Sequence, residues 1–311
     1  MKFIDLHCDT ASRIFYENLD LRNKLCKVNI DNLKKGENLG QVFAFFINVE
    51  LNNDPFEEFL KLYNRFIKEI EKNSNEIEIV RNMKELRAIE EAGKIGAFLS
   101  IEEGEVIKGS ISNLKKVYDM GIRILTITWN YKNQLGFPNA EFIYKDRGLT
   151  KKGIEVIEEC ESLGIIPDVS HLSDAGFYDI VKNCKKPFVA SHSNSRAITN
   201  HPRNLDDNMI RLLGEKGGVM GINFCSDFLG NNKLSSIEEM VAHIKHIKKI
   251  GGIEVLALGS DFDGIPNEVE IKNASEFNKL HKVLIDNNFK ESEIEKIFYK
   301  NAIRVFDETL K

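Results

Sequence analysis

Short apolar segments alternate with longer amphipathic stretches along the whole chain. The short segments are rich in Val, Ile and Phe, which is typical of buried strands. They predict eight strands, at residues 3–9, 42–49, 95–102, 124–129, 165–170, 188–193, 218–224 and 255–262. The amphipathic stretches predict helices at 55–72, 109–120, 150–163, 173–184, 205–215 and 236–250, and a helical tail at 275–308. Eight strands that alternate with helices over about 250–300 residues predict a (β/α)8 TIM barrel with a C-terminal helical extension.

The first strand argues against the competing fold, a doubly wound open sheet. That fold usually has a glycine-rich turn after its first strand, whereas this strand ends in the letters HCDT. Local capping signals support the predicted breaks, since Thr150 precedes one helix and Gly164 follows it. Because no long linker, low-complexity tract or internal repeat interrupts the pattern, we expect residues 1–311 to form a single domain.

Composition narrows the class of protein further. With 42% hydrophobic and 29% charged residues, the chain is expected to be globular. A net charge of −5 argues against nucleic acid as a partner, because phosphate binding needs concentrated Lys and Arg. No apolar run approaches about 18 residues and no signal peptide is evident, so we expect no membrane association. The five cysteines are scattered without a CxxC pair, which fits reduced thiols and a cytoplasmic location.

Ionisable residues recur at the ends of the predicted strands. They are, in strand order, His7 and Asp9, Glu102, His171, His192 and Asp261. A TIM barrel carries its chemistry at these C-terminal ends. Because alternate residues of a strand share a side, we expect His7 and Asp9 to point into the barrel, while Ile4, Leu6 and Cys8 face the helices.

A bound metal would explain this pattern. Each residue alone could be a structural hydrogen-bonding group, but several unpaired ionisable groups in one cavity would be costly to bury. A divalent cation compensates such a cluster, and imidazole nitrogens and carboxylate oxygens are ligands that zinc and similar ions prefer. The strand ends therefore predict a metal site.

Several motifs in these places carry a resemblance to a known family. They read DLHCDT, SIEEGE, GIRILTITWNYKN, DVSHLS, ASHSNSRAI, HPRN and GSDFDG, and they extend from residue 5 to residue 264. In this order and spacing the chain resembles the renal (membrane) dipeptidase family of zinc peptidases, within the metal-dependent amidohydrolases. The resemblance implies a dinuclear zinc dipeptidase, with other divalent metals as an alternative, that hydrolyses free L,L- or L,D-dipeptides.

The resemblance also implies roles for individual residues. His7 and Asp9 would bind one metal, His171 and His192 the second, and Glu102 would bridge the two. A bridging carboxylate holds two cations roughly 3.5–4 Å apart, and a water molecule shared between them loses a proton near neutral pH. That hydroxide would attack the peptide carbonyl, so that no Ser or Cys nucleophile is needed.

Two further residues match family positions beyond the metal ligands. Asp261 falls where the family has its acid/base residue, with Asp263 in the same motif as the alternative. Arg203, in HPRN, matches the residue that binds the substrate carboxylate, for which a guanidinium is well suited. Its other interpretation is a surface salt bridge.

The chain departs from the family pattern in three places. Trp129 stands where many members have a histidine thought to steady the oxyanion, and we expect Asn130 or the metals to take over that task. Glu103 replaces a usual glycine, but the spacing to Trp129 favours Glu102 as the bridge. Cys225 replaces a frequent aromatic residue near the substrate, which would alter side-chain preference.

Two other functions compete with a dipeptidase. The first is a related amidohydrolase that acts on another amide, an N-acyl amino acid or a lactone with the same metals. The second is a barrel that has lost catalysis and only binds a ligand, but all five metal ligands are present, which argues against it. Family members are often homodimers, so the resemblance suggests a homodimer whose partner in catalysis is a small dipeptide.

Overall fold

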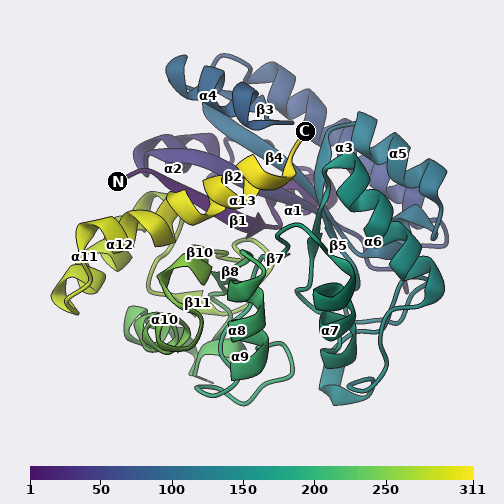
Figure 1. Ribbon diagram of the computed structural model, residues 1–311. Coiled ribbons are helices and arrows are strands. Elements are labelled where there is room, and N and C mark those ends of the chain that lie inside the picture. Colours follow the sequence, from purple (N-terminus) through teal and green to yellow (C-terminus); the bar gives the residue numbers. More distant parts are fainter. Residues whose placement is uncertain (231) are drawn as a thin grey trace.

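The strands form a closed parallel barrel, as the sequence predicts. The computed structural model describes residues 1–230 and 232–311 (Figure 1). Around the barrel the order is β2-β1-β10-β8-β7-β6-β5-β4, and pairing of β2 with β4 closes the ring. The strands of the ring are β1 (Phe3–Cys8), β2 (Asn38–Phe46), β4 (Ile95–Glu102), β5 (Ile122–Thr126), β6 (Ile166–Asp168), β7 (Val189–Ala190), β8 (Val219–Ile222) and β10 (Leu256–Leu258).

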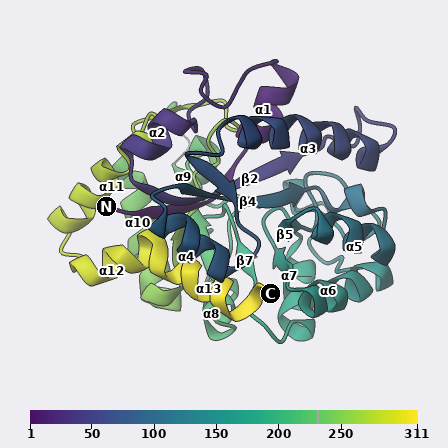
Figure 2. The same ribbon diagram turned by 90° about the horizontal axis from the view of Figure 1, so that it is seen from above.

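Helices surround the ring, as Figure 2 shows from above. They are α1 (Thr10–Tyr16), α2 (Ile30–Lys35), α3 (Pro55–Lys72), α4 (Met83–Glu91), α5 (Ile111–Asp119), α6 (Lys151–Leu163), α7 (Asp174–Asn183), α8 (Asp207–Glu215), the short α9 (Ser226–Leu229) and α10 (Ile237–Gly251), followed by α11 (Asn278–Asp286), α12 (Glu291–Glu295) and α13 (Asn301–Thr309). The predicted tail is therefore helical but interrupted. Asn288, at φ 64°, turns the chain between α11 and α12, and a π-helical turn over Lys296–Lys300 leads into α13.

Three short strands have no counterpart in the predicted pattern. β3 (Ile77–Ile79) pairs with β4 outside the ring, and β9 (Leu234–Ser235) pairs separately with β11 (Glu268–Val269). Segments of two or three residues carry too little periodicity to be detected. Several barrel strands are also shorter than predicted, and β6, β7 and β10 end before His171, His192 and Asp261.

The barrel interior is filled by apolar side chains. One buried cluster draws on every strand of the ring, through Ile4, Leu6, Val42, Phe98, Ile124, Ile166, Val189, Val219 and Ala257. Ala302, Val305 and Phe306 of α13 join the same cluster, and Figure 1 shows α13 lying across the barrel. The rings of Phe98 and Phe306 have centroids 4.6 Å apart. The last helix thus closes one end of the barrel.

The first strand corrects one prediction from strand alternation. His7 reaches the site and Cys8 packs with the outer cluster, as expected, but Ile4 and Leu6 belong to the interior cluster rather than facing the helices. The cause is a shift in the register of β1 against β2 between Asp5 and Cys8. Such an irregularity breaks the alternation of sides, so that Leu6 and His7 both face inward.

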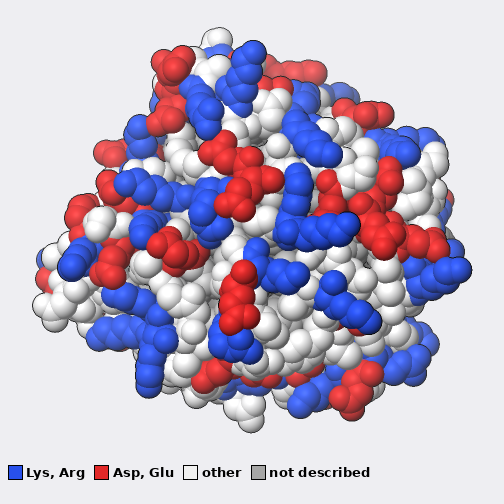
Figure 3. All heavy atoms as spheres, in the orientation of Figure 1, with Lys and Arg blue, Asp and Glu red and all other residues white. Residues whose placement is uncertain are grey.

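Surface properties agree with the composition. Lys and Arg side chains are interspersed with Asp and Glu on the face drawn in Figure 3, so that neither sign dominates it. Among the described residues, no helix combines the length and apolar character that crossing a bilayer requires.

Truncation of the closing helix tests its contribution to stability. Phe306→Ala should lower the free energy of unfolding by about 3–5 kcal/mol, because it removes a fully buried aromatic ring from a close-packed interior. Equilibrium urea unfolding measures this loss. Glu308→Ala, at an exposed position of the same helix, is the matched control and should change stability by less than about 0.5 kcal/mol. A loss below about 1 kcal/mol for Phe306→Ala would contradict the role of α13 as a closing element.

Candidate active site

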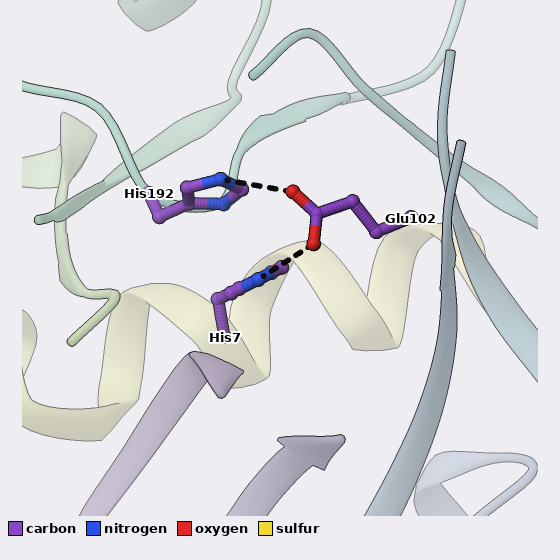
Figure 4. Close-up of side chains that lie close together, drawn as sticks. All are labelled: His7, Glu102 and His192. Carbon is purple, nitrogen blue, oxygen red and sulfur yellow. Dashed lines mark ion pairs between the residues drawn. The ribbon is translucent and has the colours of Figure 1, made fainter. Parts of the chain in front are cut away.

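The five predicted metal ligands meet at one mouth of the barrel. His7 lies near the end of β1, Asp9 comes directly after this strand, and Glu102 ends β4. His171 and His192 come from the turns after β6 and β7. Figure 4 shows the carboxylate of Glu102 between the imidazoles of His7 and His192. All five side chains are buried, with at most 8% of any residue exposed.

The carboxylate of Glu102 divides the cluster into two groups. Its Oε2 lies 3.3 Å from Nε2 of His7, and Oδ2 of Asp9 lies 3.5 Å from the same nitrogen. Its Oε1 lies 3.2 Å from Nε2 of His171 and 3.5 Å from Nε2 of His192. One oxygen of Glu102 therefore faces each pair, which is the arrangement that a bridging carboxylate requires.

Hydrogen bonds on the far side of two imidazoles set their protonation. Nδ1 of His171 lies 3.0 Å from Oδ1 of Asn130, and Nδ1 of His192 lies 2.7 Å from Oγ of Ser191. With its oxygen towards His171 the Asn130 amide can only accept, and the Ser191 hydroxyl donates to Asp168, so in this arrangement both Nδ1 atoms carry the proton. Both Nε2 atoms then present lone pairs, only 3.1 Å apart. Two lone pairs and a carboxylate oxygen facing one point form a donor set that suits a divalent cation.

The other side of the cluster also fits a metal. Nε2 of His7 is buried and has no hydrogen-bond partner. It lies with Glu102 and His192 in one group of potential ligand atoms within 4.8 Å of one another, and with Asp9 and Asp261 in a second such group. Imidazole nitrogens and carboxylate oxygens are the donors that zinc binds. The residues present therefore fit divalent ions on both sides of Glu102.

Burial and mutual repulsion shift the pKa values in this cluster. Burial and the negative charge of Glu102 raise the pKa of Asp9 to about 8. Burial, with the positive charge of Arg203, lowers the pKa of His171 to about 3, and burial also lowers that of His192. These two imidazoles are thus neutral, as metal ligands must be. For His7, burial favours the neutral form, but the carboxylates of Glu102 and Asp9 raise its pKa well above the usual value.

The two aspartates after β10 differ in their surroundings. Oδ1 of Asp261 lies 3.9 Å from Nε2 of His7, and its Oδ2 accepts from Nδ2 of Asn223 at 2.9 Å. The side chain of Asp263 is fully buried, and its carboxylate accepts from Thr10 Oγ1 (2.6 Å), Arg13 Nη1 (2.9 Å), Lys27 N (2.9 Å) and Val28 N (3.3 Å). With all its lone pairs engaged, Asp263 holds the loop together, and Asp261 is the aspartate that faces the site.

Arg203 lies beside the cluster with unused donors. The residue is 4% exposed, and its Nη2 donates to the carbonyl oxygen of His192 at 3.2 Å. Its Nε and Nη1 are buried without a hydrogen-bond partner. The ring of Phe228 lies against the guanidinium, at 5.2 Å from Cζ to the centroid. Arg203 is therefore a buried cation that lacks an anion, which rules out the surface salt bridge considered from the sequence.

A cavity of about 430 Å³ opens beside these residues. Its walls include Asp9, Glu102, Trp129, Asn130, His171, Arg203, Cys225, Phe228 and Asp261. A wider groove of about 860 Å³ shares four of them, namely Asn130, His171, Arg203 and Phe228. Three of the predicted ligands (Asp9, Glu102 and His171) thus line the same cavity as Asp261 and Arg203, and His7 and His192 lie behind them outside its lining.

The departures from the family pattern have structural explanations here. The ring of Trp129 packs edge-on against Phe46, with centroids 4.7 Å apart, and its backbone N–H donates to Glu103 at 3.0 Å. Glu103 also accepts from the backbone of Glu105 and the side chain of Asn133. Burial raises the pKa of Glu103 to about 7. Glu103 therefore anchors the Trp129–Asn133 loop and leaves Glu102 to face the site.

Sequence reasoning missed three supporting residues: Asp168, Ser191 and Asn223. Asp168 and Ser191 lie close in sequence to the predicted ligands, in the motifs DVSH and ASHS. This proximity is the sequence feature that could have identified them. Asn223 holds Asp261 and the carbonyl oxygen of His192 through one amide group. Nothing in its local sequence distinguishes it from an ordinary loop residue.

Comparisons with known proteins find similar sequences. The family model described as membrane dipeptidase (peptidase family M19) matches residues 1–311. An uncharacterised dipeptidase of Schizosaccharomyces pombe is 29% identical over 338 residues, covering 99% of this chain and 80% of the relative.

Solved structures share the fold. A metallopeptidase from Rhodobacter sphaeroides, bound to a phosphinate mimic of the dipeptide L-Ala-D-Ala, has a TM-score of 0.90 at 21% identity, covering 99% of both chains. A structure described as dipeptidase AC, of family M19, has a TM-score of 0.91 at 22% identity and covers 100% of this chain and 99% of that one.

An isosteric pair of variants tests the division between the two aspartates. Asp263→Asn should lower the free energy of unfolding by about 3 kcal/mol, because an amide nitrogen would then face donors in a buried place. Asp261→Asn is the matched control, since both residues have left-handed backbone angles that Asn tolerates, and it should show no comparable loss. Urea unfolding of both variants measures the difference, and equal stability would contradict the structural role of Asp263.

Proposed function

The chain belongs to the membrane dipeptidase family, peptidase family M19, and is therefore a hydrolase; we propose that it cleaves the peptide bond of free dipeptides at a centre of two zinc ions. One observation carries the metal centre. Nε2 of His171, Nε2 of His192 and Oε1 of Glu102 converge within 3.1–3.5 Å without a proton to share. His7 and Asp9 supply the second set of ligands on the other oxygen of Glu102.

The chemistry divides between the ions and the side chains around them. When bound, two zinc ions would polarise the scissile carbonyl and lower the pKa of a water molecule between them, so that it attacks as hydroxide near neutral pH. Asp261 faces His7 with one oxygen and is held by Asn223 through the other. It would accept the proton of the attacking water and deliver it to the leaving amine.

Arg203 would define the substrate as a free dipeptide. Its two unpartnered N–H groups are buried beside the cavity, and a buried cation without an anion is costly. The α-carboxylate of a dipeptide would satisfy them and end the substrate at its second residue. Amides and longer chains that lack a carboxylate at that distance would leave the guanidinium unpaired.

Asn130 would take the place of the family histidine. Its Oδ1 accepts from His171, which leaves Nδ2 as a donor beside the cavity that Asn130 lines. Trp129 turns its ring to Phe46. The amide would therefore donate to the carbonyl oxygen as negative charge develops on it, which is the task of an oxyanion donor. Trp129 would contribute an apolar wall for the substrate.

The proposed substrates include L,D-dipeptides as well as L,L-dipeptides. The relative that binds a mimic of L-Ala-D-Ala supports this extension. In this proposal the protein needs no membrane anchor or nucleic acid, and a homodimer would not contribute to the site.

Metal analysis and dipeptide hydrolysis together test the proposed function. Purified protein should hold about two zinc ions per chain, lose activity on dialysis against a chelator and regain it with zinc. His171→Ala should lose both zinc and turnover, by more than about 100-fold, because a direct ligand is removed. His246→Ala is the matched control, since His246 pairs with Asp207 outside the cluster. Full activity of His171→Ala, or of the metal-free protein, would refute the metal centre.

The arginine is tested with substrates that differ only in their terminal charge. Wild-type protein should prefer a free dipeptide over its C-terminal amide by about 100-fold or more in kcat/KM, the value of a buried charge-assisted pair. Arg203→Met should lose this preference while retaining its zinc, and Arg203→Lys should fall between the two. If Arg203→Met kept the preference for the free carboxylate, another group would have to bind it.

A further inference from the structure

A buried carboxylate lies behind the ligand group, on the side away from the cavity. Asp168, at the end of β6, is fully buried. Its Oδ1 accepts from the backbone N–H groups of Ser170 (3.0 Å) and Ser191 (2.9 Å). Its Oδ2 accepts from the hydroxyls of Thr126 (2.7 Å) and Ser191 (2.6 Å). The two backbone N–H groups can only donate, so Oδ1 carries no proton, and both hydroxyls can donate to Oδ2.

The charge of Asp168 follows from the same contacts. Burial alone favours the neutral acid, but the hydrogen bonds from Ser191 and Ser170 lower the pKa of Asp168. The residue is therefore a carboxylate. A carboxylate accepts and cannot donate, so the hydrogen bond between Asp168 and Ser191 has only one possible direction.

The direction of this hydrogen bond determines which nitrogen of His192 carries the proton. Ser191 has one hydroxyl proton and gives it to Asp168, so at 2.7 Å from Nδ1 of His192 its oxygen can only accept. Nδ1 of His192 must then be protonated, and Nε2 carries the lone pair. Figure 4 shows this nitrogen directed at Glu102, at 3.5 Å from Oε1.

We propose that Asp168 and Ser191 form a positioning relay that holds His192 permanently in the tautomer with its proton on Nδ1. The relay keeps Nε2 available to a cation before any cation arrives. It rests on the proposed function, because only a metal-binding His192 needs that lone pair. Neither residue touches the reacting atoms, so both act through His192.

The partner of the other histidine makes a useful contrast. His171 is oriented by Asn130, an exposed side chain whose amide can present either oxygen or nitrogen after a flip. The relay behind His192 cannot reverse in this way, because its last member has no proton to give. One imidazole of the group is therefore locked by charge, and the other is held by an adjustable amide.

An isosteric change at Asp168 tests the relay. In Asp168→Asn the amide oxygen must stay with the two backbone N–H groups, which places the new amide nitrogen against the Ser191 hydroxyl. Ser191 then accepts from this nitrogen and donates to Nδ1 of His192, which moves the imidazole proton to Nε2. Long-range proton–nitrogen NMR of metal-free protein labelled at histidine reports the tautomer, with His192 assigned by its absence in His192→Gln. Zinc affinity, measured by chelator competition, should fall by about 10–100-fold.

Two further variants separate the relay from general packing. Ser191→Ala leaves Nδ1 of His192 without a partner. It should also shift His192 towards the tautomer with the proton on Nε2, where Glu102 can accept it. This variant replaces Asp168→Asn in the test if Asp168→Asn does not fold. Ser193→Ala is the matched control. Ser193 is close to Ser191 in the sequence, and its hydroxyl is also buried but has no hydrogen-bond partner. It should change neither tautomer nor zinc affinity.

The outcomes distinguish the two proposals. Suppose that wild-type protein binds zinc and cleaves dipeptides, and that both relay variants keep the wild-type tautomer of His192 and the wild-type affinity for zinc. The relay is then refuted and the proposed function stands. A wild-type His192 already protonated on Nε2 would refute the relay as well. If wild-type protein has the Nδ1-protonated tautomer but binds no zinc, the proposed function fails instead.

Discussion

Three acceptor atoms that point at one another without a proton between them are the constraint on which this structure depends. Nε2 of His171, Nε2 of His192 and Oε1 of Glu102 repel one another unless positive charge lies among them. A protein does not bury such a group for stability alone, because uncompensated polar atoms are costly. The surrounding residues are arranged to keep the three atoms in this state rather than to relieve it.

The backbone bears part of that cost. His171, Asp261 and Asp263 have φ angles of 68°, 61° and 69°, in the left-handed region that residues other than glycine seldom occupy. Strain of this kind persists where the surrounding structure imposes it. Here a barrel strand, β6 or β10, fixes the start of each turn, and Asp263 ties its own loop to Thr10 and Arg13. A rigid scaffold thus holds strained turns in the places where side chains must converge.

The sequence predicted the ring of strands and the five clustered residues, because both follow from local pattern. Apolar segments that end in His, Asp or Glu identify strand ends wherever they occur along the chain. The individual roles came from the resemblance to a family, since spacing alone cannot say which carboxylate lies between two imidazoles. Three other features depend on register and on partners from elsewhere in the fold. They are the inward position of Leu6, the hydrogen bonds by which Asp263 holds its loop, and the contacts of Asp168. Such features are set by tertiary structure and leave little trace in a single segment.

The closing helix α13 has a consequence for substrate entry and product release. Ala302, Val305 and Phe306 fill one end of the barrel, so the mouth beside Arg203 serves for both arrival and departure. A cleaved dipeptide would then empty the site in sequence, with the carboxyl-terminal amino acid retained by the guanidinium after its neighbour has left. The dissociation rate of this carboxyl-terminal amino acid would then limit how soon the next substrate molecule can bind.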